Sequence, residues 1–313
     1  MTGKSNRTPT PAPEEPCGVL IVDKHAGVTS HDIVGTVRRL YHTRSVGHTG
    51  TLDPLATGVL VVLVGRAVKA SEYLMSERKS YRAALRLGTV TDTGDITGTV
   101  LRQSDRIPTT EEMLAVLPRF RGDVSQIPPM YSALKVNGQK LVDLARRGIT
   151  VEREERQIRI YRLEAAPTQM PTEYTLDVEC SGGTYIRTLC EDIGEALGCG
   201  GTMAALCRTE TCGFSIAQAY TVDRLSAMSD EERLACLLPT EELFRDLPRV
   251  VLQDFHEHLL RNGCAVLEKK LGVSCAVGTR VRLCRRDGNF FALGEAIDAP
   301  EGTAIRAIKL FVL

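Results

Sequence analysis

The feature that most constrains this chain is the loop at residues 47–58, Gly-His-Thr-Gly-Thr-Leu-Asp-Pro-Leu-Ala-Thr-Gly, which runs directly into the aliphatic segment at residues 59–64. Its three glycines and one proline predict sharp turns and allow another group to approach the backbone closely. The aliphatic segment predicts a buried strand that anchors the loop, so Asp53 should be held steadily. On residue types alone, Asp53-Pro54 is more simply explained as a turn, and a function for Asp53 needs support from elsewhere in the chain.

Alternating and helical patterns predict strands and helices on both sides of this loop. Residues 18–24 predict a buried strand, followed by a helix from about residue 30 with Ser30 as its cap. Residues 81–87 and residues 174–180 alternate apolar and polar side chains, and each predicts a strand with one buried face. A helix follows the second of these strands and should end at Gly198. Short strands separated by turn residues after residue 247 predict a small β-barrel.

Length and composition bound the class of protein. With 313 residues and 43% hydrophobic side chains, the chain can bury a sizeable core, and we expect one large domain and one small one. Its apolar segments are too short to span a bilayer, and residues 1–16 are polar and proline-rich, so we predict a cytoplasmic protein with a disordered N-terminal tail and no membrane partner. The ten cysteines form no CxxC pair and no zinc-binding spacing with histidine, so we expect reduced thiols and no bound metal.

The net charge of zero argues against a uniformly basic nucleic-acid binder, but the charges are unevenly distributed. Residues 65–90 have six basic and two acidic side chains, and residues 135–162 have eight and four, whereas residues 223–246 have seven acidic side chains and three arginines. The basic segments could supply phosphate contacts if they converge in space. Solvated strand and helix surfaces are the simpler explanation for any one of them.

The loop at residues 47–58 is accompanied by further distinctive blocks, at residues 23–30, 79–82, 91–95, 181–187 and 205–209. Together they resemble the motifs of the bacterial TruB-type tRNA pseudouridine synthases, in which the loop is the active-site motif. Two departures are His25, where that family usually has a proline, and Cys207 in the last block. The resemblance extends from about residue 17 to the C-terminus.

The resemblance implies an isomerase that converts uridine to pseudouridine. In that family the aspartate corresponding to Asp53 is catalytic, the arginine corresponding to Arg187 pairs with it, and the tyrosine corresponding to Tyr81 stacks on the target uracil and is a candidate proton acceptor. We therefore expect these three residues to be catalytic. The sequence leaves open whether the carboxylate attacks ribose C1′ or uracil C6. No cofactor is expected, because a carboxylate can act as nucleophile or base by itself.

Five further residues are expected to bind the substrate. The histidine corresponding to His48 fills the gap left when the target base flips out of the RNA, and the leucine corresponding to Leu206 packs against that base. Tyr185 lies at a predicted strand-to-helix junction in the same motif as Arg187, and Asp95 lies at an acidic position that recurs in the family. Lys69 belongs to a basic segment and to a short helix predicted at residues 67–76.

The resemblance also implies the architecture, an α+β pseudouridine synthase domain whose mixed, largely antiparallel sheet is flanked by helices. We place this domain at residues 17–246, with the RNA-binding insertion of the family, often described as a thumb, at about residues 128–157. Residues 247–313 resemble a PUA domain, a small RNA-binding β-barrel. The expected substrate is uridine 55 in the T-loop of tRNA, and the expected partner is the T-arm stem-loop, bound by a monomer.

Two other functions are compatible with the residues alone. A nucleotide-glycoside hydrolase could use the same aspartate, but it would require a second carboxylic acid for the leaving group, and the sequence shows no carboxylate paired with Asp53. A non-enzymatic RNA-binding factor would use the basic segments and the C-terminal barrel without Asp53. Formation of pseudouridine, of free uracil, or of neither distinguishes the three.

Overall fold

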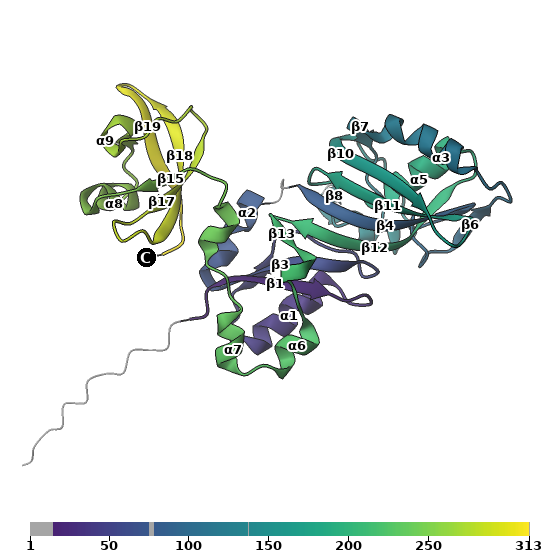
Figure 1. The fold of residues 1–313 in the computed structure, drawn as a ribbon, viewed down its shortest axis with the longest axis horizontal. Coiled ribbons are helices and arrows are strands. Elements are labelled where there is room, and N and C mark those ends of the chain that lie inside the picture. The colour runs from purple at the N-terminus through teal and green to yellow at the C-terminus, as the bar shows by residue number, and fades with distance from the viewer. Residues whose placement is uncertain (1–14, 75–77, 137, 313) are drawn as a thin grey trace, which may run out of the picture.

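The computed structural model describes residues 15–74, 78–136 and 138–312, which form one large and one small sheet (Figure 1). The tail predicted at residues 1–16 lies outside the described residues apart from its last two. Within the described residues, no helix has the length and apolar character needed to cross a membrane.

The large sheet has ten strands and is mixed, with mostly antiparallel pairing, as the sequence predicts. Its main path runs β14-β1-β3-β12-β4-β11-β10-β7, while β2 pairs with β3 and β13 with β12. The pairs β1–β14 and β12–β3 are parallel. The strands are β1 (Gly18–Lys24), β2 (Val46–His48), β3 (Thr57–Val64), β4 (Lys79–Leu87), β7 (Gly122–Gln126), β10 (Arg156–Pro167), β11 (Glu173–Cys180), β12 (Gly201–Thr211), β13 (Phe214–Ser215) and β14 (Tyr220–Thr221).

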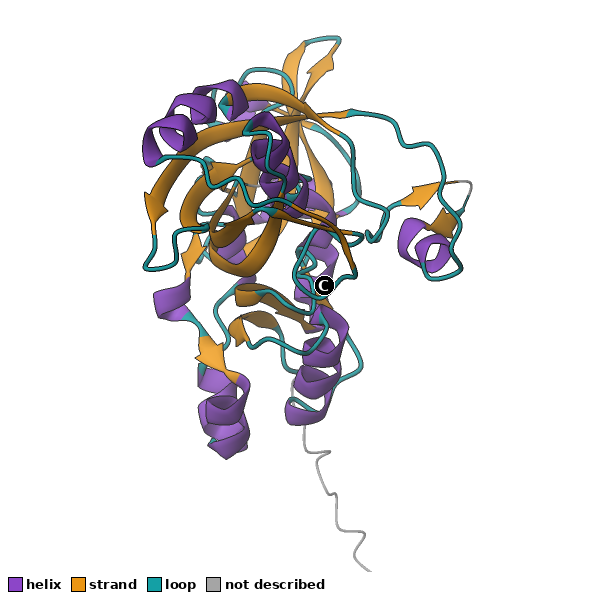
Figure 2. Cartoon of the chain, turned by 90° about the vertical axis from the view of Figure 1, so that its right-hand side faces the viewer, coloured by secondary structure: helices purple, strands orange, loops and turns teal. Residues whose placement is uncertain are grey.

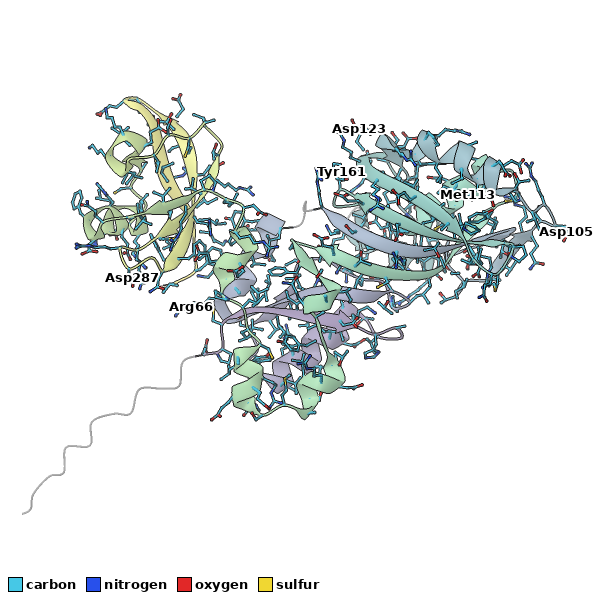
Figure 3. All side chains as sticks on the ribbon, viewed as in Figure 1. Arg66, Asp105, Met113, Asp123, Tyr161 and Asp287 are labelled. Atoms are coloured by element: carbon cyan, nitrogen blue, oxygen red, sulfur yellow. The ribbon has the colours of Figure 1, made fainter. Side chains whose placement is uncertain are left out.

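Helices cover two regions of this sheet and bury separate apolar cores. The helices α3 (Thr110–Val116) and α5 (Ile186–Ala196) pack on β4, β10 and β11, whereas α1 (Ser30–Leu40) and α6 (Val222–Ala227) pack on β1 and β3 (Figure 1). Met113 of α3 is fully buried, and Figure 3 shows it within this half of the molecule. The other helical segments of the large sheet's half are α2 (Ser71–Leu74), α7 (Asp230–Ala235), and the 3₁₀ turns η1 (Gly65–Ala70), η2 (Leu117–Phe120), η3 (Ile216–Gln218) and η4 (Thr240–Phe244).

One local prediction is wrong. Thr29, not Ser30, caps α1: its hydroxyl accepts a hydrogen bond from the Asp32 amide (3.1 Å), and the Asp32 carboxylate accepts one from the Thr29 amide (2.8 Å). Ser30 is instead buried and bonds to the Asp53 loop.

The short helix predicted at residues 67–76 is helical over its described part, as the end of the 3₁₀ turn η1 followed by the single turn α2. Residues 75 and 76 lie outside the described residues.

Two small hairpins extend from the large sheet. The first pairs β5 (Thr89–Thr91) with β6 (Val100–Gln103). The second pairs β8 (Lys135–Val136) with β9 (Gln139–Lys140) and is followed by α4 (Leu141–Ala145). Figure 2 shows two short strands and a helix at the end of a loop that reaches away from the main body. This excursion joins β7 to β10 and covers most of the insertion predicted at residues 128–157.

The C-terminal sheet has five strands in the order β15-β17-β18-β19-β16 and encloses its own apolar core. Its elements are β15 (Arg249–Val251), α8 (Asp254–Arg261), β16 (Val266–Leu267), α9 (Glu268–Leu271), β17 (Arg280–Cys284), β18 (Phe290–Ala299) and β19 (Gly302–Leu310). Phe290 and Phe311 of this region pack against Phe244 of η4, with ring centroids 5.4–5.9 Å apart. The two sheets therefore share an apolar joint.

Candidate active site

The residues on either side of Asp53 are fixed by polar side chains from other segments. The Ser30 hydroxyl accepts a hydrogen bond from the Leu52 amide (2.8 Å) and donates one to the Leu52 carbonyl (3.2 Å). The ammonium group of Lys24 donates to the carbonyl of Pro54 (3.3 Å) and to two carbonyls near the start of α1. Lys24 is fully buried, and this burial lowers its pKa to about 8, although the Asp53 carboxylate opposes the shift.

The two ends of the loop are joined by Arg208 of β12, a buried arginine. Its Nε donates to the carbonyl of Val59 (2.7 Å), and one terminal nitrogen donates to the carbonyl of Gly50 (3.1 Å). The Arg208 backbone also lies against Gly58, which has a φ of +96°. A Cβ atom at Gly58 would lie 2.3 Å from the Arg208 carbonyl oxygen, so this position requires glycine.

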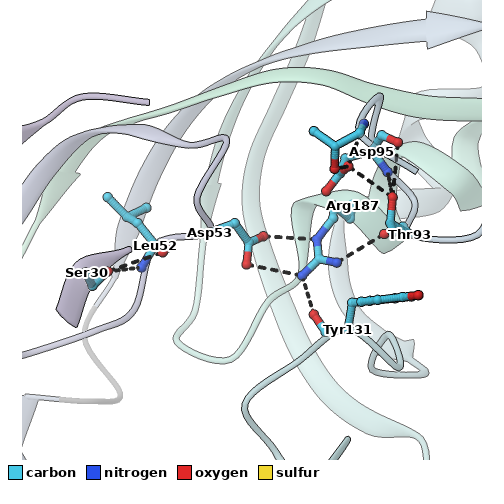
Figure 4. Close-up of polar contacts among 8 residues, drawn as sticks. Ser30, Leu52, Asp53, Thr93, Asp95, Tyr131 and Arg187 are labelled. Atoms are coloured by element: carbon cyan, nitrogen blue, oxygen red, sulfur yellow. Dashed lines mark hydrogen bonds and ion pairs between the residues drawn. The ribbon is translucent and has the colours of Figure 1, made fainter. Parts of the chain in front are cut away.

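Arg187 lies directly against Asp53, although 134 positions separate them in the chain. Its Nε lies 3.0 Å from Asp53 Oδ2, and a terminal nitrogen lies 3.2 Å from Oδ1. The other contacts of the guanidinium are to the carbonyls of Thr93 (3.1 Å) and Tyr131 (2.7 Å) (Figure 4). Arg187 is 4% exposed and Asp53 35% exposed, so a rigid, buried cation holds a carboxylate that solvent or substrate can reach.

Tyr81 and Leu206 form an apolar wall in the same core as Leu52, next to Asp53. They come from the adjacent strands β4 and β12, where Tyr81 pairs with Arg208 and Leu206 pairs with Ala83. Burial raises the pKa of the Tyr81 phenol, and the nearby Arg208 guanidinium offsets only part of that shift. The phenol therefore stays protonated near neutral pH.

His48 and Tyr185 lie at the edges of the same region. The Nδ1 atom of His48 is buried and has no hydrogen-bond partner within the described part of the chain. Burial, followed by the charge of Arg208, lowers the pKa of His48 and favours the neutral imidazole. Tyr185 immediately precedes α5, which carries Arg187, and burial raises the pKa of its phenol.

The charged groups of Asp95 and Lys69 form hydrogen bonds with groups other than Asp53. The Asp95 carboxylate accepts hydrogen bonds from the Thr97 amide (2.9 Å) and the Thr93 hydroxyl (3.0 Å), so it shapes the loop that presents the Thr93 carbonyl to Arg187. Lys69 donates to the carbonyl of Leu310 (3.2 Å) and joins η1 to the C-terminal sheet. Neither side chain is hydrogen-bonded to Asp53 among the described residues.

Sequence reasoning missed the supporting roles of Ser30, Lys24 and Arg208. The one signal available was an ionisable residue inside an apolar strand pattern, at Lys24 and Arg208, because such a residue must find polar partners when buried. No group of three or more histidine, cysteine, aspartate and glutamate side chains within the described chain is arranged to hold a metal ion. The site therefore places the Asp53 carboxylate, held in one orientation, beside the apolar wall of Tyr81 and Leu206. This arrangement suits nucleophilic or base chemistry on a flat ligand.

Family models match most of the chain. The model of the TruB family pseudouridylate synthase N-terminal domain matches residues 38–186, and that of the tRNA pseudouridylate synthase B C-terminal domain matches residues 187–245. The chain is 40% identical to the tRNA pseudouridine synthase B of Clostridium tetani over 296 residues, which are 94% of this chain and 99% of that protein. It is 44% identical to that of Alkaliphilus oremlandii over 79% of this chain and 81% of that protein.

Solved structures share the fold. The crystal structure of a Cbf5-Nop10-Gar1 complex matches with a TM-score of 0.71 and 25% identity, covering 94% of this chain and 85% of the other. An H/ACA RNP bound to a substrate RNA containing 2′-deoxyuridine matches with a TM-score of 0.70 and 22% identity, over 95% of this chain and 85% of the other. These likenesses confirm the predicted fold class.

Proposed function

Because the chain belongs to the TruB family of tRNA pseudouridine synthases, which isomerise uridine to pseudouridine in tRNA, we propose that its target is uridine 55 in the T-loop. The observation that best supports a working site is the Asp53–Arg187 pair, in which one hydrogen bond and a second close ion-pair contact aim one carboxylate. Such a pair can supply the group that breaks the glycosidic bond.

The reaction breaks the bond between uracil N1 and ribose C1′ and forms a bond between C5 and C1′. C5 loses a proton and N1 gains one, so atoms balance without an oxidant or co-reactant. Asp53 acts by attack at ribose C1′ or at uracil C6, and Arg187 keeps its carboxylate aligned in either case. The apolar wall formed by Tyr81 and Leu206 retains the detached uracil while the base rotates.

Tyr81 and Leu206 are proposed to contact the two faces or edges of the flipped uracil. The raised pKa of the Tyr81 phenol disfavours a phenolate, which supports stacking by Tyr81 over proton acceptance. Tyr185 closes the same pocket. The neutral imidazole of His48 is proposed to occupy the space vacated by the base, where stacking is worth about 1–3 kcal/mol.

RNA contacts outside the pocket are proposed for two segments. They are the insertion at residues 128–157, which lies within the catalytic domain at residues 17–246, and the domain at residues 247–313. Lys69 lies on η1, beside the C-terminal sheet, where a phosphate contact could use its ammonium group. The enzyme is proposed to act as a monomer on the T arm in the cytoplasm, with Asp95 contributing by shaping the loop that supports Arg187.

A T-arm stem-loop RNA tests the proposal. The purified protein is incubated with this RNA, the nucleosides are separated, and the converted position is mapped. Pseudouridine at position 55, and none in a stem-loop with cytidine at that position, is expected. Conversion at another uridine would overturn the assignment of uridine 55, and release of free uracil would favour a hydrolase.

A further inference from the structure

The chain enters the insertion through residues 126–131, which run from the last residue of β7 and contact the start of α5 at two points. Gln126 makes the first contact, to Tyr185, and the Tyr131 carbonyl makes the second, to Arg187. The proposed chemistry gives Gln126 no role.

Gln126 binds both backbone groups of one residue. Its side-chain oxygen accepts from the Tyr185 amide (3.0 Å), and its side-chain nitrogen donates to the Tyr185 carbonyl (3.2 Å). Gln126 is 3% exposed, so these bonds form away from water. Tyr185 is the N-cap residue of α5, and its own side chain makes no capping bond to the described residues. The carboxamide therefore holds the N-cap residue of α5, which lies two residues before Arg187.

The contact of Tyr131 with Arg187 is linked to the contact of Gln126 with Tyr185 by a stiff chain segment. Pro128 and Pro129 lie between Gln126 and Tyr131, and each fixes its own φ. Arg153, at the far end of the insertion, donates to the Pro128 carbonyl (2.9 Å) and closes the excursion at its base. Figure 4 shows the Tyr131 carbonyl directed at the guanidinium that bonds Asp53.

We propose that Gln126 is a positioning residue for the isomerisation: it fixes the start of α5 and, together with the Tyr131 carbonyl, aims Arg187 at Asp53. This inference rests on the proposed function. It predicts an effect on the rate of the chemical step, because a misplacement of about 1 Å in an active site can cost about 100-fold in rate. RNA affinity should change little, since Gln126 is buried and cannot itself contact the substrate.

The test compares Gln126→Met with Gln218→Met. Methionine retains most of the volume of glutamine but leaves the Tyr185 amide without the carboxamide and removes one of two hydrogen bonds to the Tyr185 carbonyl, which also accepts from the Leu189 amide (3.1 Å). Gln218 is a matched control outside the proposed catalytic and RNA-binding residues, because its exposed side-chain oxygen also accepts from the amide of an N-cap residue, that of Ser215 (2.9 Å) at η3. At saturating T-arm RNA, Gln126→Met should lower the single-turnover rate about 10–100-fold with the RNA Kd within about threefold, and Gln218→Met should lower the rate less than about twofold.

A third variant separates positioning from folding. Gln126→Glu keeps the acceptor for the Tyr185 amide and loses the donor to its carbonyl, so its rate should lie between those of wild type and Gln126→Met. If Gln126→Met does not fold, the comparison of Gln126→Glu with Gln218→Glu decides. Wild-type rates in folded Gln126 variants, or a loss confined to RNA affinity, would overturn the inference. A wild-type protein that makes no pseudouridine would instead overturn the proposed function.

Discussion

The Asp53 loop and the joint between the two sheets both bring distant segments together, but they use opposite kinds of contact. Around Asp53, the side chains of Ser30, Lys24 and Arg208 make hydrogen bonds to backbone atoms. At the joint, three tilted phenyl rings make contacts with no strong directional requirement. Hydrogen bonds require specific atomic positions, whereas apolar burial stabilises a contact even when the side chains shift slightly. We therefore expect damage near Asp53 to appear in the reaction rate and damage at the joint to appear in stability.

The largest effect is expected for Asp53→Asn. Asparagine keeps the volume of the side chain and removes its charge, so the reactive group is lost while the loop contacts through Leu52 and Pro54 remain. Pseudouridine formation should fall by more than about 1000-fold, with RNA affinity within about tenfold. Nucleoside analysis and an RNA-binding titration measure the two quantities. Turnover in a preparation free of wild-type enzyme would contradict the role of Asp53.

Arg187→Lys should have the next largest effect. An ammonium group cannot reproduce the two guanidinium contacts to Asp53 while also reaching the carbonyls of Thr93 and Tyr131. The single-turnover rate at saturating RNA should fall about 100-fold, far more than the affinity. Arg121→Lys is the control, because the Arg121 guanidinium also donates to a carbonyl, that of Leu163, but far along the sheet. Equal rates for the two variants would remove Arg187 from the catalytic set.

At the joint, Phe311→Ala should act on stability. Phe311 is 3% exposed and contacts both Phe244 and Phe290, so truncation should cost about 3 kcal/mol of unfolding free energy. The single-turnover rate at saturating RNA should stay within about twofold. Phe255→Ala is the control, since Phe255 belongs to the same sheet and is 68% exposed. Denaturant unfolding gives the stabilities, and a large rate loss in a fully folded Phe311→Ala would break the distinction between the two regions.

The smallest effect concerns Glu191, one turn beyond Arg187 on α5. Burial, followed by the charge of Asp192, raises the pKa of Glu191 from 4.5 to about 7. The folded chain thus holds this proton more tightly than the unfolded chain, so the free energy of unfolding falls as the pH rises from 4.5 to 7. Glu191→Gln should be more stable than wild type at pH 8 by about 1–3 kcal/mol and similar at pH 4. Parallel unfolding curves at all pH values would show that Glu191 titrates normally.

Local patterns predicted the elements that depend on local physics. A continuous apolar run predicts β1, apolar alternation predicts β4 and β11, and Gly198 marks the end of α5. The motif resemblance also placed Arg187 beside Asp53, and the structure has them in contact. Their catalytic roles remain predictions.

The supports of the site could not be predicted, because they depend on which backbone atoms the fold brings together. The position of Ser30 before a helix predicts a cap, yet its neighbour Thr29 has the same capping chemistry and the correct spacing to Asp32. The strand pattern around Arg208 does not indicate that its guanidinium bonds the carbonyls of Gly50 and Val59. The bonds of Gln126 to Tyr185 likewise join residues 59 positions apart.

The contact between β3 and β12 also sets when the Asp53 loop can close during synthesis. The bond from Arg208 to Val59 spans 149 positions of the chain. Ribosomes add about 5–20 residues per second, so β12 is made about 7–30 s after β3. During that interval the loop lacks the strand whose Arg208 side chain joins its two ends. The side chain of Asp53 is therefore not held in one orientation. A nascent chain released before β12 would therefore contain the complete active-site motif without being able to assemble it.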